Sequence, residues 1–182
     1  MTERAFWVFG YGSLMWQPGF EALERQHAVL PGYRRGFALR SIRYRGTPRA
    51  PGLVLGLDWR PEGRCEGIAF RVCPSRETEV RAYLHHREMV TRSYIEVCMP
   101  VHLQNGETAP ALTYVLDRTH PQYAGQLGLE EQAAIIARAN GPAGPNRDYL
   151  HNTVAHLREC GIEDTDLFTL DALVRQLEAQ DV

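Results

Sequence analysis

Alternating and helical patterns of apolar residues divide the chain into a strand-rich part, up to about residue 117, and a helical last third. Short apolar or alternating runs bounded by glycine, proline and polar residues are typical of strands. Gly46-Thr-Pro48, Pro51-Gly52 and Pro61-Glu-Gly63 predict turns between several of these runs. The predicted strands are Ala5–Phe9, Gly36–Ile42, Leu53–Trp59, Glu66–Val72, Tyr94–Leu103 and Ala111–Leu116.

Helical spacing predicts one helix among the strands and three after them. Ser75 is a suitable N-cap for the first helix, which should run to about Met89. Asn146 can cap another helix that runs to Cys160, with one apolar face. The remaining two helices are predicted at Leu129–Ala139, with a stop at Gly141, and at about Leu167–Leu177.

No composition shift, repeat or linker interrupts this succession of elements. A chain of 182 residues with 44% hydrophobic residues can form one domain with a substantial core. The order of elements favours an antiparallel or mixed sheet over repeated βαβ units. We therefore expect one α+β domain over residues 1–182, strand-rich to about 117 and helical beyond.

Charge and cysteine usage narrow the possible partners. The formal net charge is −2, which disfavours nucleic-acid binding. In the Arg-rich stretch from Arg34 to Arg49, apolar residues such as Phe37 and Leu39 alternate with arginines, as in a half-solvated strand. The four cysteines form no Cys-x-x-Cys pair and no zinc-type spacing with histidine, so no metal site is expected. Without a signal peptide or long apolar run, the expectation is a soluble cytoplasmic protein with reduced thiols and no membrane partner.

The run from Phe6 to Met15 is the most informative stretch, because an apolar strand leads directly into Gly10-Tyr-Gly-Ser-Leu14. Such a turn can direct several backbone N–H groups to one point and hold an anion or a developing oxyanion. A dinucleotide fingerprint would need a third glycine where Met15 stands, and the Gly-Lys-Ser/Thr of a phosphate-binding loop is absent. An ordinary glycine turn remains the alternative interpretation.

Glu88 is a second candidate for chemistry. On a helical wheel it lies about 40° beyond Leu84, at the edge of an apolar stripe formed with Val80 and Tyr83. Partial burial and the negative end of its helix would raise its pKa and make it a useful base near neutral pH. A solvated Glu88 paired with an arginine is the alternative. Metal-binding histidine pairs and a Ser13-based triad are disfavoured, since the spacing and the nucleophile elbow they need are missing.

Together these motifs resemble the ChaC-type γ-glutamylcyclotransferases, which act on glutathione. Each motif is weak alone, but all of them occur in order and with similar spacing over nearly the whole chain. Ile95 after Tyr94 and Gly36 depart from the family's pattern, where basic residues are frequent. The motifs are Val8-Phe-Gly-Tyr-Gly-Ser-Leu14, Arg45-Gly-Thr-Pro48, Pro51-Gly-Leu53, Tyr83-Leu84, Arg87-Glu88, His120-Pro-Gln-Tyr-Ala-Gly125, Tyr149-Leu150 and Asn152-Thr153.

The resemblance implies a small mixed β-barrel flanked by helices. It also implies a cofactor-free carbon–nitrogen lyase of the amidine-lyase type, which converts glutathione to 5-oxoproline and cysteinylglycine. By the same resemblance Glu88 is the catalytic general acid/base and Tyr149 a pocket residue, with Ser41 and Arg49 as weaker candidates for substrate binding. The predicted γ-glutamyl pocket is lined by Tyr11, Gly12, Ser13 and Leu14.

Two other functions stay open at this level. A cyclotransferase for other γ-glutamyl amines or dipeptides would use the same chemistry. A non-enzymatic regulatory or binding protein would bind a ligand or partner without turnover. Release of 5-oxoproline from a panel of γ-glutamyl compounds distinguishes all three.

Overall fold

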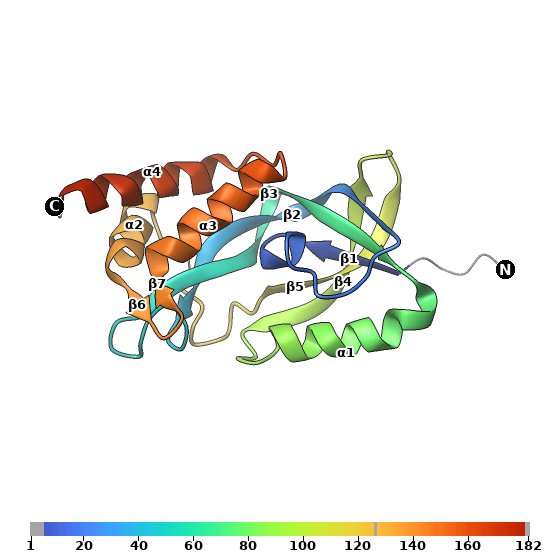
Figure 1. The fold of residues 1–182 in the computed structure, drawn as a ribbon, viewed down its shortest axis with the longest axis horizontal. Helices are drawn as coiled ribbons and strands as arrows, with labels where there is room; N and C mark the ends of the chain where they lie inside the picture. The colour runs from blue at the N-terminus through green and yellow to red at the C-terminus, as the bar shows by residue number, and fades with distance from the viewer. Residues whose placement is uncertain (1–5, 126, 181–182) are drawn as a thin grey trace. The chain divides into compact units, whose positions relative to one another are not determined.

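The computed structural model describes residues 6–125 and 127–180, and their longer strands close into a barrel (Figure 1). The strand order is β1-β3-β2-β4-β5. β1 runs parallel to β5 and antiparallel to β3, while β4 pairs antiparallel with both β2 and β5. The predicted mixed β-barrel is therefore confirmed. Its strands are β1 (Phe6–Gly10), β2 (Glu24–Ser41), β3 (Gly52–Val72), β4 (Tyr94–Leu103) and β5 (Thr108–Leu116).

Helices flank the strands, as predicted, and most of them follow the barrel in sequence. Short 3₁₀ turns precede β2 and α1, and a two-stranded hairpin precedes α3. Within the part of the chain that the structure describes, no helix is both long and apolar enough to cross a membrane. These elements are η1 (Ser13–Met15), η2 (Pro74–Arg76), α1 (Glu77–Glu88), α2 (Leu129–Arg138), β6 (Asn140–Gly141), β7 (Gly144–Pro145), α3 (Asn146–Glu159) and α4 (Thr165–Gln180).

The chain forms two compact units that share the long strands β2 and β3. Unit 1 contains the residues up to Arg35 and Leu57–Asp117, and unit 2 contains Gly36–Gly56 and the residues from Arg118 onward. Unit 1 therefore holds β1, β4, β5 and α1, whereas unit 2 holds α2, α3 and α4. The expectation of one domain over residues 1–182 stays a prediction.

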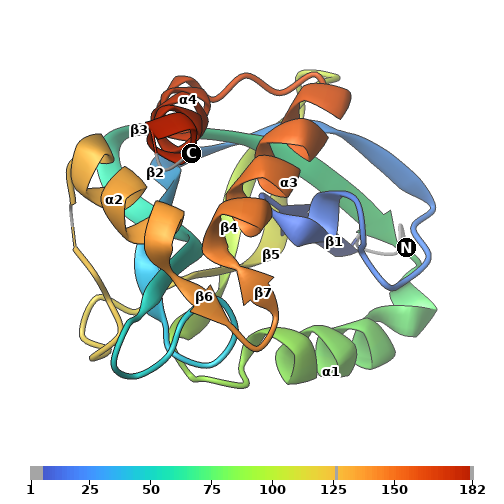
Figure 2. The ribbon, with the colours of Figure 1, turned by 60° about the vertical axis from the view of Figure 1, so that its left-hand side comes forward.

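In unit 1 the core lies among the barrel strands, and α1 lies beside them (Figures 1 and 2). All five residues of β1 are buried, in agreement with its continuous apolar sequence. Val80 and Leu84 form the buried face of α1, as the helical spacing predicts, whereas Tyr83 of the predicted stripe is exposed. The Arg81 guanidinium lies over the Phe6 ring at 4.6 Å, so the helix also contacts the first strand through a cation–π interaction.

In unit 2 the three helices α2, α3 and α4 pack against one another. Leu150, Val154 and Leu157 form the predicted apolar face of α3, and all three are buried. The segment around Tyr123 adds to β2 as a short extension, because Tyr123 bridges to Leu39.

The sequence interpretation of the long strands needs one correction. Leu53–Trp59 and Glu66–Val72 belong to one continuous strand, β3, so the predicted turn at Pro61-Glu-Gly63 is wrong. A Cβ on Gly63 would lie 2.7 Å from the backbone of Tyr33 in β2. This glycine permits close approach of two strands rather than a reversal of the chain. β2 likewise begins at Glu24, well before the predicted Gly36, and the predicted start of the first strand, Ala5, lies outside the described residues.

Both predicted helix caps are also wrong. Ser75 lies in the 3₁₀ turn η2, and Arg76 occupies the cap position of α1 without a side-chain hydrogen bond. Asn146 is the first residue of α3 and is fully buried. Its side-chain oxygen accepts a hydrogen bond from Leu53 N–H at 2.7 Å, and its Nδ2 donates to the Leu53 carbonyl at 2.8 Å. Two buried backbone groups of β3 require partners, and the amide of Asn146 supplies both.

Candidate active site

The glycine loop forms a tight 3₁₀ turn directly after β1. Met15 N–H donates to the Gly12 carbonyl at 2.9 Å, and Gln17 N–H donates to the Ser13 carbonyl at 2.8 Å. The side chains of Tyr11 and Leu14 point into the core, while Ser13 is exposed. The first N–H groups of a helical turn have no partner within that turn, so they need an acceptor from elsewhere.

Arg35, in β2, holds the start of this loop. Its Nε donates to the Tyr11 carbonyl at 2.6 Å, and its Nη2 donates to the Glu66 carbonyl. The residue is only 5% exposed, so these charge-assisted bonds lie in the interior of unit 1. The sequence analysis missed this contact, although the signal was present: Arg35 is two residues from buried Phe37 and so belongs to the inward series of the strand.

Arg87, near the end of α1, reaches the same loop from another direction. Its Nη2 donates to Ser13 Oγ at 2.9 Å, and its Nη1 donates to the Gln17 carbonyl at 2.6 Å. Nη1 also lies 3.1 Å from the Tyr83 hydroxyl, one turn earlier on the helix. The loop and the last two turns of α1 are thereby joined through one guanidinium.

Glu88 follows directly in sequence and is largely buried, with 19% of its side chain exposed. Burial raises the pKa of the Glu88 carboxyl, and the positive charge of Arg87 opposes this effect. Its Oε1 lies 3.3 Å from Arg87 Nε. The prediction of a raised pKa is thus confirmed. Glu88 is paired with an arginine, as in the alternative interpretation, but the pair is partly buried rather than solvated. The cause is burial, the first of the two reasons inferred from the sequence.

A buried phenol from β5 completes the surroundings of Glu88. Tyr114 is 1% exposed and donates to Glu96 Oε2 at 2.9 Å, across the β4–β5 pair. Burial raises the pKa of Tyr114, and the negative charges of Glu96 and Glu88 add to this effect. The phenol therefore stays protonated over the physiological range. Sequence reasoning missed Tyr114, because only its strand partner shows that it faces a carboxylate.

The remaining predicted substrate-binding residues, Tyr149, Ser41 and Arg49, belong to unit 2. Tyr149, on α3, packs edge-to-face on Phe37 with ring centroids 5.7 Å apart, and the Arg45 guanidinium lies 5.4 Å from its ring. Its hydroxyl accepts a hydrogen bond from Leu55 N–H at 3.4 Å.

Ser41 and Arg49 differ sharply in their surroundings. Ser41 is buried, and its Oγ accepts a hydrogen bond from Arg45 N–H at 3.0 Å, which stabilises the turn after β2. Arg49 is exposed, in the loop between β2 and β3. Within unit 2 the structure thus places Ser41 and Tyr149 around Arg45 and leaves Arg49 on the surface.

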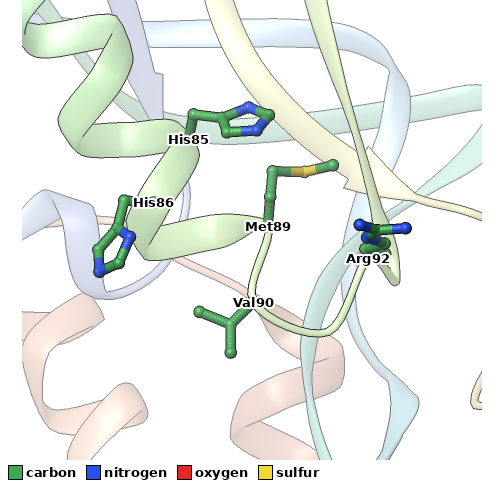
Figure 3. A pocket seen from close by; sticks show the side chains of 5 residues that line it. All are labelled: His85, His86, Met89, Val90 and Arg92. Atoms are coloured by element: carbon green, nitrogen blue, oxygen red, sulfur yellow. The ribbon is translucent and has the colours of Figure 1, made fainter.

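An open groove of about 590 Å³ lies at the C-terminal end of α1 (Figure 3). Its lining contains none of the predicted site residues, although Met89 directly follows Glu88 in sequence. Arg92 has a left-handed backbone with φ of 55°, which marks the sharp turn that leads into β4. The lining residues are His85, His86, Met89, Val90 and Arg92.

Over residues 6–125 and 127–180, no cluster of histidine, cysteine, aspartate and glutamate side chains is arranged to hold a metal ion. The four cysteines are free thiols. His151 is instead bonded between carboxylates of α4, with Nδ1 2.6 Å from Asp171 and Nε2 3.0 Å from Glu178. Arg175 and Arg147 pair with the same two carboxylates, so this cluster has the composition of an ion-pair network.

Comparison with known proteins places the chain in a family. The glutathione-specific γ-glutamylcyclotransferase of Escherichia coli K12 is 35% identical, over 98% of this chain and 76% of its own length. The enzyme of the same name from Schizosaccharomyces pombe is 36% identical, over 96% and 94%. Human glutathione-specific γ-glutamylcyclotransferase 1 is 32% identical, over 90% and 74%.

The crystal structure of a yeast γ-glutamylcyclotransferase specific to glutathione has the same fold. Its TM-score is 0.81 at 24% identity, and the match covers 95% of this chain and 99% of that one. The family model described as ChaC-like protein matches residues 6–177. From the glycine loop after β1 to the helices of unit 2, the chain therefore belongs to the ChaC-like family.

Proposed function

We propose that this protein is a γ-glutamylcyclotransferase that converts glutathione to 5-oxoproline and cysteinylglycine. The observation that carries the proposal is a buried carboxylate of raised pKa, Glu88, tied through Arg87 to the Gly10-Tyr-Gly-Ser-Leu14 loop. The similarity to glutathione-specific enzymes over nearly the whole chain supports the same substrate.

The reaction is internal to the substrate. The α-amine of the γ-glutamyl residue attacks its own γ-carbonyl carbon, so one C–N bond forms and the amide C–N bond breaks. The ring product is 5-oxoproline and the leaving group is the free amine of cysteinylglycine. No water enters the products, in keeping with a lyase. The substrate itself supplies proximity, and the protein has to hold it in a folded, near-attack conformation.

Glu88 is the proposed general acid/base for two proton transfers. An α-ammonium group has a pKa of about 8, so at neutral pH it must lose a proton before it can attack. The departing amide nitrogen must gain one, because an amide anion is a very poor leaving group. A carboxylate of raised pKa can accept the first proton and donate it to the leaving nitrogen.

Tyr11, Gly12, Ser13 and Leu14 are the proposed γ-glutamyl pocket. The N–H groups at the start of the turn supply dipoles for the substrate carboxylate or for the tetrahedral oxyanion. For unit 2, substrate-binding roles of Tyr149, Ser41 and Arg49 rest on the family resemblance. A cytoplasmic location belongs to the same proposal, since that compartment keeps free cysteines reduced.

We expect the purified protein to release 5-oxoproline and cysteinylglycine from glutathione in equal amounts. The assay includes γ-glutamyl dipeptides and γ-glutamyl amines at equal concentration, with both products quantified by chromatography. Higher kcat/KM for another γ-glutamyl compound would assign a different substrate to the same chemistry. Binding of glutathione without turnover would instead support a regulatory protein.

The acid limb of the pH profile should lie above the ordinary carboxyl range. Glu88 must be deprotonated to accept the amine proton, and burial raises its pKa from the usual 4.5. As pH falls through this raised pKa, kcat/KM for glutathione should decrease with the slope of one proton. Initial rates between pH 4 and 9 in buffers of constant ionic strength measure the limb. A limb at or below pH 4.5 would contradict the role of Glu88 as the base.

A further inference from the structure

We propose that Arg87 is a positioning residue, which fastens the substrate loop to the catalytic end of α1 and holds the Glu88 carboxylate beside it. This inference rests on the proposed function and adds to it a residue whose role neither the family resemblance nor the relatives' names assign. Arg87 is 74 residues from Ser13 in sequence, yet one guanidinium contacts both this loop and the adjacent carboxylate.

The Arg87 guanidinium is planar and presents five N–H donors in fixed directions. They reach both the loop and Glu88, and Nη1 also lies 3.1 Å from the Tyr83 hydroxyl and 3.4 Å from the Pro18 carbonyl. Nη2 meets Ser13 Oγ, Nη1 meets the Gln17 carbonyl, and Nε faces Glu88 Oε1. The side chain is 23% exposed, so these contacts are partly shielded from water. A lysine ammonium lacks this planar array of donors and would not hold all these partners at once.

Arg87 and Tyr83 of α1 both contact the segment from Ser13 to Gly19. Arg87 bonds to Ser13 and Gln17, and Tyr83, on the preceding turn, lies against Gly19. Gly19 has φ of 75°, and a Cβ there would lie 1.9 Å from the Tyr83 hydroxyl. The chain therefore passes directly against Tyr83, whose hydroxyl in turn lies 3.1 Å from Arg87 Nη1. Loss of Arg87 would remove the side-chain hydrogen bonds that join α1 to Ser13 and Gln17.

Arg87 is also the cation that opposes the effect of burial on the Glu88 pKa. The nearby charged or titratable groups include Tyr114 of β5 and its partner Glu96 of β4. Arg81 and His85 of α1 each lie 3.7 Å from Glu96, and His86 and Arg92 line the groove at the end of the helix. Tyr114 stays protonated and the Arg81 guanidinium lies 3.7 Å from Glu96, so neither replaces Arg87 as the direct counterion of Glu88.

The test compares Arg87→Met, Arg87→Lys and the control Arg76→Met. Arg76 sits at the other end of α1, where it pairs with Glu79 at 2.9 Å and with Glu21 at 2.8 Å, outside residues 12–17 of the turn. Hydrogen exchange by mass spectrometry is read at the amides of Met15, Trp16 and Gln17, whose N–H groups bond within the turn. These amides should exchange about tenfold faster in Arg87→Met and at the wild-type rate in Arg76→Met.

Kinetic measurements distinguish the two roles of Arg87, its hydrogen bonds to the loop and its positive charge beside Glu88. In Arg87→Met, KM for glutathione should rise about tenfold, and the acid limb of kcat/KM should move to higher pH because the opposing cation is gone. In Arg87→Lys the charge remains, so the limb should stay close to wild type while KM still rises. The lysine variant is also the milder change and keeps the test open if the methionine variant does not fold.

The proposal would be overturned if Arg87→Met changed neither the hydrogen-exchange rates of the turn nor the acid limb of kcat/KM. It would also be overturned if Arg87→Lys had the wild-type KM and the wild-type exchange rates. Hydrogen exchange needs no substrate. If the wild-type protein failed to convert glutathione, the proposed function would fail, while the exchange data would still decide whether Arg87 orders the loop.

Discussion

Glu88→Gln is expected to lower kcat for release of 5-oxoproline from glutathione by about 10³-fold, in the middle of the usual range for an acid–base residue. The amide has the shape of the carboxylate but cannot take the ammonium proton or return it to the leaving nitrogen. Both proton transfers depend on the Glu88 carboxylate, so the substitution should impair both of them. The 5-oxoproline assay with saturating glutathione measures the loss.

The stability of Glu88→Gln follows from the sign of the pKa shift. The folded protein binds the Glu88 proton more tightly than the unfolded chain does, because the folded pKa is raised. This contribution to stability is full below the unfolded pKa of about 4.5 and is lost as pH rises through the folded value. At neutral pH the wild type thus contains a partly buried charge that glutamine avoids, and the variant should melt at the wild-type temperature or slightly above.

Glu79→Gln is the matched control for this prediction. Glu79 lies on the same helix and is exposed. It pairs with Arg76 at the start of the helix, whereas Glu88 lies at its end. Glu79→Gln should keep wild-type turnover. Wild-type kcat in Glu88→Gln, or equal losses in both variants, would remove Glu88 from the mechanism.

The fold could be predicted closely wherever one local pattern decided the outcome. Tyr94–Leu103 was predicted from its pattern and forms β4 with those same bounds. The predictions were wrong where a residue's role depends on a contact with a residue distant in sequence. Gly63 permits close approach to Tyr33, and Asn146 bonds to Leu53, which is 93 residues away. Gly and Asn are also typical turn and cap residues, so local reasoning assigned them those roles.

In the candidate site, too, the local features could be predicted from the sequence and the contacts between distant segments could not. Burial of Glu88 at the edge of an apolar helix face follows from the period of 3.6 residues, and the structure confirms it. The contacts of Arg87 with Ser13 and of Arg35 with Tyr11 join segments far apart in sequence. Helical or strand periodicity indicates which face a residue occupies, but not which distant residue it contacts. The sequence could therefore indicate the two halves of the site in unit 1, but not the contacts through which Arg87 connects them.

Gly12→Val is expected to reduce kcat/KM for glutathione by about 10²–10³-fold, as for loss of an oxyanion-type donor. Gly12 is at the start of the turn, and its carbonyl accepts the Met15 N–H. A branched side chain there would keep the substrate away from the backbone N–H groups of the turn. Gly12 is only half-buried, so the melting temperature should fall by a few degrees at most. Turnover and thermal unfolding, measured on the same samples, separate the two effects.

Gly10→Val is the comparison variant for this prediction, because it should lower stability as well as activity. A Cβ on Gly10 would lie 3.0 Å from the Leu14 Cβ and 3.3 Å from the Met15 nitrogen, inside the fully buried end of β1. Valine at this position must displace the turn, so stability should fall by about 1–3 kcal/mol together with activity. If Gly12→Val lost stability in the same proportion as Gly10→Val, the loop glycines would serve packing alone. A large loss of kcat/KM in a Gly12→Val protein of near-native stability would instead assign Gly12 to the approach of substrate to the backbone.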